Sequence, residues 1–394
     1  MKTAIVGGGA AGFFLAVNLK ETMPQMDVVI FERSTKVLAK VAVSGGGRCN
    51  CTNSFEGVKD LSAVYPRGHR LMKRLFHVFS PQQTFEWFER HGVPLVTQDD
   101  HCVFPASQQS QSIIDCLIGE ARRRGVTIKT KRKVSSLNEL TDFDYVAVTT
   151  GGSPRGEGLQ WLIDAGHEVQ PPVPSLFSLA IADDALRALT GTVVPIATAF
   201  IPSTKLRTQG PLLITHWGMS GPAILKLSSH GARLLHDADY RLPIGINWLS
   251  GKDTETAAAL MAEAHEHLQR QLLNSCPFGL PARLWSYLLE KSLGEKSTLR
   301  WCDISKKDFH RLTNTLCNDI YQTVGRAPFR DEFVTCGGIS LSAVNPSTLE
   351  SRTVPHLYFA GEVLDIDGIT GGFNLQAAWT TAYVVAQSII NGEH

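Results

Sequence analysis

Residues 3–32 hold the pattern that most constrains the fold of this chain. A short apolar run, residues 4–6, leads directly into Gly7-Gly8-Gly9-Ala10-Ala11-Gly12, and an apolar-rich segment predicted to be helical follows. A second apolar run, residues 28–31, ends on Glu32. Strand, glycine turn, helix, strand and acid within about thirty residues are the layout of a dinucleotide-binding βαβ unit.

Each part of this unit has a physical role. Gly7 makes the tight turn, Gly9 lets the backbone approach a pyrophosphate, and Gly12 lets the helix pack close to the strand. The backbone N–H groups at Ala10 and Ala11, with the positive end of the helix dipole, favour phosphate. Glu32 can accept hydrogen bonds from an adenosine ribose, and we include the adjacent Arg33 in the predicted site. An ordinary glycine-rich turn is the alternative, but it leaves Glu32 unexplained.

Composition narrows the class of protein. The chain has 394 residues, of which 43% are hydrophobic and 19% charged, so we expect two or three folded domains. The net charge of +1 gives no sign of a nucleic-acid or membrane partner. Eight cysteines contain no CxxC pair, which favours reduced thiols, a cytoplasmic location without a signal peptide, and no metal site. The oligomeric state is not predicted.

A second glycine turn follows the first unit. It combines backbone N–H groups with polar side chains that could contact a phosphate or the edge of a flavin ring. Its residues in the predicted site are Ser44, Gly45, Gly46, Gly47, Arg48, Cys49 and Asn50, and Lys40 precedes them. A surface loop held by its Asn and Thr side chains is the alternative.

The middle of the chain is interpreted as an insertion. Before it, a buried strand over residues 144–149 ends in Thr150-Gly151-Gly152, a turn expected beside the nucleotide, as is Val134 in a strand expected at residues 133–135. Residues 171–174 form a proline-rich linker candidate. The predicted domains are a nucleotide domain of residues 1–185 and 331–394, a β-rich insertion of 186–252 and a helical insertion of 253–330.

The C-terminal part repeats the pattern of strand, glycine and acid. An apolar run over residues 357–360 ends in Gly361-Glu362, and a glycine-containing loop then leads into a predicted helix over residues 375–390. The N-terminus of that helix could stabilise negative charge on a reduced flavin. The loop residues in the predicted site are Asp365, Gly371, Gly372, Phe373, Asn374 and Gln376. A plain NAD domain is the alternative, but it does not need this second segment.

Three stretches also resemble a known family. LAKVAVSGGGRCNCTN, THWGMSGPA and the tail from TCGGIS to AAWTTAY are similar to the bacterial YhiN/BaiN-like flavoproteins, which include aminoacetone-oxidase-like members. The resemblance covers essentially the whole chain. It implies bound FAD and an α/β, glutathione-reductase-like, Rossmann-type FAD domain built from both chain ends, with a β-barrel-like and a helical insertion. Leu38-Ala39 departs from the family's usual residues before the lysine.

The predicted function is an FAD-dependent oxidoreductase that acts on a small molecule, with NAD(P)H as a transient electron donor in one version. An RNA-modifying flavoprotein and an amine oxidase using oxygen are alternatives, as is a non-catalytic FAD-bearing partner protein. Catalytic side chains are not identified. His216 and Asp367 are weak candidates, and a capping or packing role is favoured for each.

Overall fold

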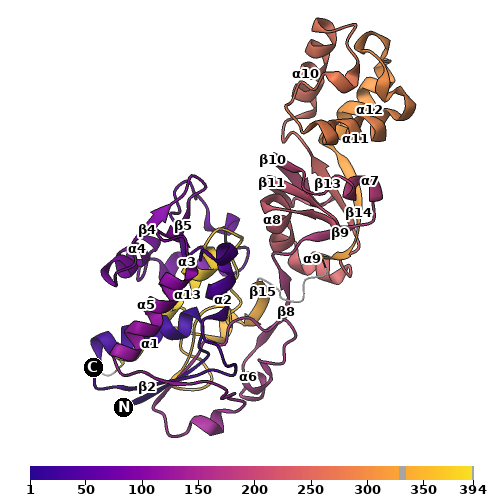
Figure 1. Cartoon of the computed structure of the whole chain (residues 1–394). Coiled ribbons are helices and arrows are strands. Elements are labelled where there is room, and N and C mark those ends of the chain that lie inside the picture. The colour runs from indigo at the N-terminus through magenta and orange to yellow at the C-terminus, as the bar shows by residue number, and fades with distance from the viewer. Residues whose placement is uncertain (328–333, 393–394) are drawn as a thin grey trace. The chain divides into compact units, whose positions relative to one another are not determined.

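The computed structural model describes residues 1–327 and 334–392 (Figure 1). The chain forms two compact units. Unit 1 comprises Met1–Pro174 and Val334–His394, and unit 2 comprises Ser175–Phe333. The boundary expected at residues 330 and 331 lies outside the described residues, so the division into three parts stays a prediction.

A parallel five-stranded sheet forms the centre of unit 1, in the order β16-β7-β1-β2-β6. The N-terminal and C-terminal chain segments of unit 1 meet in this sheet, because β16 pairs with β7 in the register Leu357↔Val146 to Phe359↔Val148. The glycine turn that follows β1 and the segment that follows β16 therefore leave the same edge of one sheet. This confirms the Rossmann-type fold built from both chain ends. The strands are β1 (Lys2–Val6), β2 (Asp27–Phe31), β6 (Thr127–Lys129), β7 (Tyr145–Val148) and β16 (Leu357–Phe359).

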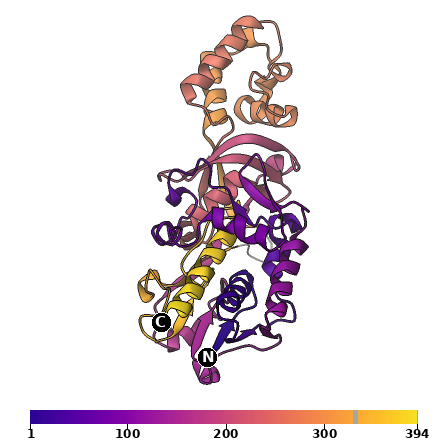
Figure 2. The same ribbon diagram turned by 90° about the vertical axis from the view of Figure 1, so that its left-hand side faces the viewer.

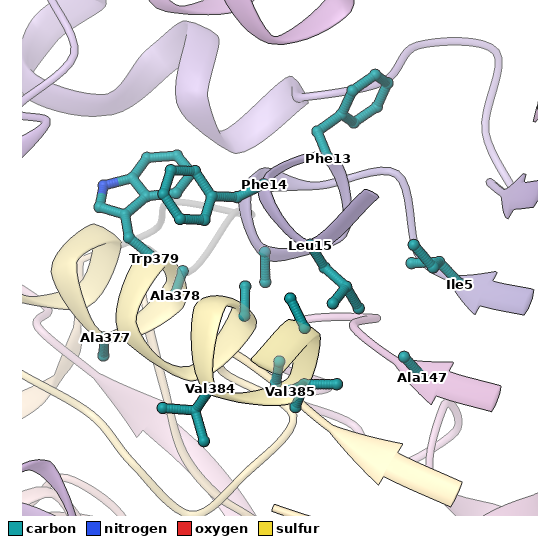
Figure 3. Close-up of a cluster of buried hydrophobic side chains, with 14 of the residues drawn as sticks. Ile5, Phe13, Phe14, Leu15, Ala147, Ala377, Ala378, Trp379, Val384 and Val385 are labelled. Atoms are coloured by element: carbon teal, nitrogen blue, oxygen red, sulfur yellow. The ribbon is translucent and has the colours of Figure 1, made fainter. Parts of the chain in front are cut away.

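Two helices, α1 (Ala10–Thr22) and α13 (Phe373–Asn391), pack against each other beside this sheet (Figure 2). Phe14 of α1 lies against Trp379 of α13 with ring centroids 5.2 Å apart, and both side chains are fully buried (Figure 3). The Trp87 ring also contacts Phe14, with ring centroids 4.5 Å apart. Aromatic rings at these separations add to the stabilisation from burial alone.

The rest of unit 1 consists of shorter elements. Helix α4 begins at a capping box in which Ser80 and Gln83 satisfy each other's backbone N–H groups. Residues 133–135 form no strand, contrary to the prediction, because β6 already ends at Lys129. The remaining elements are α2 (Ala39–Val43), α3 (His69–Leu75), α4 (Pro81–Arg90), α5 (Ser110–Arg123), α6 (Gln160–Asp164), β3 (Thr52–Asn53), β4 (Leu95–Thr97), β5 (Cys102–Pro105), β8 (Val169–Ser175) and β15 (Val334–Ile339).

A closed barrel of six strands, in the order β10-β11-β12-β9-β14-β13, forms the β-rich part of unit 2. It includes β9, so the barrel begins before residue 186. Trp248 is buried at its end and donates through Nε1 to Asp319 Oδ2 at 3.0 Å. The strands are β9 (Leu179–Ile181), β10 (Val193–Phe200), β11 (Arg207–Thr215), β12 (Gly218–Ser220), β13 (Pro243–Asn247) and β14 (Asp319–Arg326).

Helices α10, α11 and α12 gather at one end of this barrel (Figure 1). Trp285 of α11 is buried among them and donates to Leu272 O at 2.8 Å. The helices of unit 2 are α7 (Asp184–Arg187), α8 (Pro222–His230), α9 (Ala232–Asp237), α10 (Asp253–Glu266), α11 (Ala282–Leu293) and α12 (Lys306–Cys317). Across the described residues of both units, every helix is too short or too polar to cross a membrane.

The contact of α1 with α13 can be tested by truncation of Phe14. We expect Phe14→Ala to lower the free energy of unfolding of unit 1 by about 3–5 kcal/mol, because it leaves a cavity among buried aromatic rings. Urea unfolding followed by tryptophan fluorescence measures the change. The control is Val96→Ala, since Val96 is 39% exposed and should cost less than about 0.5 kcal/mol. Equal effects of the two substitutions would contradict this account of the core.

Candidate functional site

The first glycine turn is packed too closely for any side chain at two of its positions. Gly7 has φ +123°, and a Cβ atom there would lie 2.4 Å from Thr149 O. A Cβ atom at Gly12 would lie 2.0 Å from Gly7 O. Thr149 fixes the turn from the neighbouring strand, because its Oγ1 donates to Gly7 O at 2.9 Å. The turn and the helix start are thus held against β7.

The third glycine of the turn, in contrast, faces open space. No atom lies within 4 Å of a Cβ built on Gly9. The helix begins there without a side-chain cap or an acidic residue in its first turn. The N–H groups of Ala10, Ala11 and Gly12 have no acceptor in the described part of the chain. Unpaired N–H groups, a positive dipole end and room for close approach fit a pyrophosphate.

Glu32 lies beside this turn at the end of β2. Its Oε2 accepts from Gly8 N at 2.9 Å, and its Oε1 accepts from Ser34 N at 2.8 Å. These bonds fix the carboxylate, and each oxygen keeps a further lone pair for a ribose hydroxyl. Arg33 is exposed next to it. Val134 is buried in a small cluster with Ala4 and Val6 of the central strand β1, so its side chain packs against one face of the sheet.

The second glycine turn, Ser44–Gly47, is a tight turn with left-handed backbone at its glycines. Gly45, Gly46 and Gly47 have φ of 57°, 68° and 86°, and Cβ atoms at Gly46 and Gly47 would meet open space. Arg48 stacks on the Phe104 ring at 4.2 Å to its centroid. The turn is therefore held at its C-terminal end while two glycines leave backbone exposed.

Asn50 connects this turn to the C-terminal return. With its amide oriented to satisfy both partners, it accepts from Gly372 N at 3.2 Å and donates to Thr52 O at 2.9 Å. A Cβ atom at Gly372 would lie 2.1 Å from Thr52 O, so only glycine fits there. Thr52 Oγ1 donates to the buried Gln376 Oε1 at 2.5 Å. Asn50 and Gln376 thus link residues 50–52 to the start of α13. The sequence alone did not show that these two distant segments are in contact.

The start of α13 resembles the start of α1. It has no side-chain cap and no acidic residue in its first turn, and Gly372 precedes it with φ 89°. The Asn374 side chain bonds to Gly368 N and O at 2.8 and 2.9 Å, which closes the loop before the helix. Phe373 is buried against the Tyr65 ring. Phe373 and Asn374 shape the site through their side chains. Their backbone N–H groups belong to the first turn of α13.

Glu362 ties three segments together. Its Oε2 forms an ion pair with Lys40 Nζ at 2.8 Å, and its Oε1 accepts from Thr335 N at 2.8 Å. A Cβ atom at Gly152 would lie 2.5 Å from Glu362 Oε1, and one at Gly151 would lie 3.9 Å from Glu362 Oε2. Thr150 is exposed before this turn. Lys40, Gly152 and Glu362 are therefore neighbours, as their joint assignment to one site requires.

A buried ion pair stabilises the loop that leads to α13. Asp367 is fully buried, and both of its oxygens accept from the guanidinium of Arg67. The pairing raises the pKa of Arg67 against the lowering effect of burial, so the guanidinium stays charged. Asp365 lies in the same loop and donates its N–H to Ile339 O at 2.9 Å. Asp367 acts here as a structural anion, and Arg67, 300 residues away, had no local signal in the sequence.

Cysteine chemistry is not favoured at this site. Cys49 and Cys51 are fully buried, and burial raises the pKa of the Cys51 thiol well above its usual value, with a further rise from the Cys49 thiol. Protonated thiols are poor nucleophiles at neutral pH. His216 is exposed at the turn between β11 and β12 of unit 2. The buried thiols of unit 1 therefore supply no catalytic side chain.

Comparison with known proteins agrees with this geometry. Residues 1–388 match the family described as HI0933-like protein Rossmann domain. The chain belongs to the HI0933-like family. This confirms the expected YhiN/BaiN-like flavoproteins, and the turn, acid and helix starts described above fit their FAD cofactor. Ala10–Gly12 and Glu32 would hold its pyrophosphate and ribose, and the start of α13 would face its flavin ring.

Two relatives span nearly the whole chain. Ribosomal RNA dihydrouridine synthase of Escherichia coli (strain K12) is 29% identical, over 98% of this chain and 97% of that protein. The 3-dehydro-bile acid delta(4,6)-reductase of Clostridium scindens is 26% identical, over 98% of each. The fold is also similar to that of 3-ketosteroid delta1-dehydrogenase from Sterolibacterium denitrificans, with a TM-score of 0.53, 11% identity and 99% of each chain covered.

The open space at Gly9 gives a test of FAD binding by this HI0933-like protein. We expect Gly9→Ala to raise the Kd for FAD by about tenfold or more, because the added methyl group blocks close approach of the pyrophosphate. The apoprotein should keep its stability, since φ −92° suits alanine and the methyl group meets no protein atom. Fluorescence titration of FAD into apoprotein measures Kd. Gly119→Ala, in α5 and equally open, is the matched control. Unchanged FAD affinity in Gly9→Ala would rule out this pyrophosphate position.

The structural role of Asp367 can be tested separately. We expect Arg67→Met to lower the free energy of unfolding by about 3–5 kcal/mol, because it removes the guanidinium that pairs with a buried carboxylate. The double substitution Arg67→Met/Asp367→Leu should recover most of that loss, since it removes the buried carboxylate as well. Urea unfolding of the three proteins measures both effects. A double variant no more stable than Arg67→Met would show that the pair does not account for the loss.

Proposed function

We propose that this FAD-dependent oxidoreductase uses NAD(P)H to reduce a carbon–carbon double bond conjugated to a carbonyl group, and that its substrate is a uracil base in ribosomal RNA. The reaction consumes NAD(P)H, one proton and the alkene, and it gives NAD(P)⁺ and the saturated product. When bound, FAD carries the hydride between the two substrates.

The similarity of this chain to two relatives over nearly its whole length supports this proposal. One is named for making dihydrouridine in ribosomal RNA, and the other for reducing delta(4,6) double bonds of a 3-dehydro-bile acid. In uridine, the C5=C6 bond is conjugated to the C4 carbonyl. In the bile acid, the 4,6-diene is conjugated to the 3-oxo group. Both names therefore describe one reaction type, addition of hydrogen to an electron-poor alkene.

Ribosomal RNA is favoured over a small molecule by the higher identity of the RNA-named relative and by the exposed basic residues Arg70, Lys73, Arg74 and His77. A steroid-like enone is the second candidate, because the bile-acid-named relative covers the chain equally well. The net charge of +1 does not decide between them, since phosphate binding depends on local charge.

The fold also bears on the order of the reaction. The described residues contain one parallel sheet with a glycine turn, and unit 2 is built on a closed antiparallel barrel. NAD(P)H thus has no second Rossmann sheet to occupy in the described part of the chain. Alternate binding of NAD(P)H and acceptor at one flavin site predicts ping-pong kinetics.

An anaerobic half-reaction assay tests the proposal. We expect NADH or NADPH to bleach the flavin absorbance, and unmodified ribosomal RNA made by transcription in vitro to restore it. Mass spectrometry of the digested RNA should then show a uridine that has gained two hydrogens. Poly(A), which contains no uracil, is the control.

Other outcomes separate the alternatives. Reoxidation by a 3-oxo-4,6-dienoic steroid but not by RNA would support the second candidate. A flavin that NAD(P)H does not reduce, but that an amine reduces before air reoxidises it, would identify an amine oxidase and contradict the proposal.

A further inference from the structure

Helix α3 (His69–Leu75) presents two sharply different faces. Leu71, Met72 and Leu75 are buried, and Tyr65 and Phe76 pack nearby. On the opposite side, Arg70, Lys73, Arg74 and His77 are exposed. Their spacing of three, four and seven residues places these four side chains on one stripe of the helix and its C-terminal extension. We call these four residues the basic stripe.

Few negative charges oppose the basic stripe. Residues 61–85 contain no Asp or Glu. Within residues 1–327 and 334–392, Arg70, Lys73 and Arg74 form no ion pair. Asp60 precedes this segment; it interacts electrostatically with His69 and Lys73 while it accepts two bonds from Ser62. Arg74 donates to Ser347 Oγ at 2.7 Å.

Other basic side chains in unit 1 are used differently. Lys40 pairs with Glu362, and Arg124 pairs with both Glu21 and Glu120. A solvated helix face usually mixes both signs of charge, whereas the basic stripe concentrates one sign, and Arg70, Lys73 and Arg74 form no ion pair with a described carboxylate. Such a face lowers the free energy of a bound polyanion.

The position of α3 is fixed by the loop that precedes α13. Arg67, two residues before the helix, forms the buried pair with Asp367. Tyr65 donates its hydroxyl to Phe373 O at 2.8 Å. A Cβ atom at Gly68 would lie 2.7 Å from the Ile366 side chain. The stripe is therefore carried on the same rigid segment as the start of α13, where the flavin ring is expected.

We propose that the basic stripe of α3 binds the phosphate backbone of the substrate RNA next to the flavin end of the site. The inference rests on the proposed function and names the surface that would hold its substrate. From Arg70 to His77 the stripe is about 10 Å long at 1.5 Å per residue, enough for more than one phosphate of a strand. Arginine and lysine bind phosphate oxygens through charge-assisted hydrogen bonds. These contacts position RNA and leave the choice of base to the site.

A charge-removal experiment on the FAD-loaded protein tests this surface. The variant is Arg70→Gln/Lys73→Gln, and the matched control is Lys306→Gln/Lys307→Gln, which removes two exposed lysines of α12 beside His310 and Arg311 in unit 2. The probe is a fluorescein-labelled transcript of ribosomal RNA, and anisotropy gives its affinity at several salt concentrations. FAD content and melting temperature check that each variant folds.

We expect the α3 variant to bind RNA about 10- to 30-fold more weakly at 0.1 M salt. The slope of log affinity against log salt should fall by about 1.4, because each single-strand phosphate contact contributes about 0.7. The α12 variant should bind as the unaltered protein does. The RNA-dependent reoxidation of flavin should show a higher KM for the α3 variant with little change in kcat.

Three results would overturn the inference. The α3 variant binds RNA like the unaltered protein; or only the α12 variant is weakened; or the α3 variant loses NADPH affinity and keeps RNA affinity, which would assign the stripe to a nucleotide phosphate. Failure of the proposed function looks different, because then the unaltered protein binds or ignores RNA but reduces no uridine in it.

Discussion

The packing of α1 against α13 is the contact on which the rest of unit 1 depends. Parallel strands end at a common edge of their sheet, so the two helices that follow β1 and β16 both begin at that edge. They can approach closely because the contact includes small residues: a Cβ atom at Gly361 would lie 3.1 Å from Ala11 Cβ and 3.9 Å from Ala378 Cβ. Gly361 N also donates to Thr381 Oγ1 of α13 at 2.8 Å. This packing fixes two uncapped helix N-termini in one place.

Two such N-termini give the site its electrostatic character. Neither helix carries an acid in its first turn, so no side chain of the helix itself neutralises the partial positive charge. The carboxylates nearby, Glu32 and Glu362, are instead occupied by backbone N–H groups and by Lys40. An anionic cofactor is thus expected at the two helix N-termini, where backbone dipoles rather than cationic side chains stabilise it. Such dipoles need little reorganisation when the charge on the cofactor changes.

The loops around the site are fixed by buried polar bonds. Between β16 and α13 the chain has little regular structure, yet Asp367 in that segment is fully buried, as is Gln376 in the first turn of α13. Each would be costly without a partner, and each has one from a distant segment, Arg67 and Thr52. These bonds fix α3 relative to the start of α13, so a surface helix without a recognisable sequence motif is held next to the proposed substrate site.

The sequence determined the βαβ unit, the returning strand with its glycine and acid, the Rossmann-type fold and the family. These follow from local patterns: apolar runs, glycines where a Cβ would clash, and an acid at a fixed distance. It also predicted a strand at residues 133–135 that does not form, since three residues of strand-like composition do not pair without a neighbour.

The tertiary structure alone decided which strands close the barrel, the pairs Lys40–Glu362 and Arg67–Asp367, and the placement of the basic stripe beside the start of α13. The members of these two pairs are 322 and 300 residues apart in the chain. Local propensity and periodicity cannot specify such pairs, because their formation depends on how whole elements pack and on which polar groups that packing removes from water.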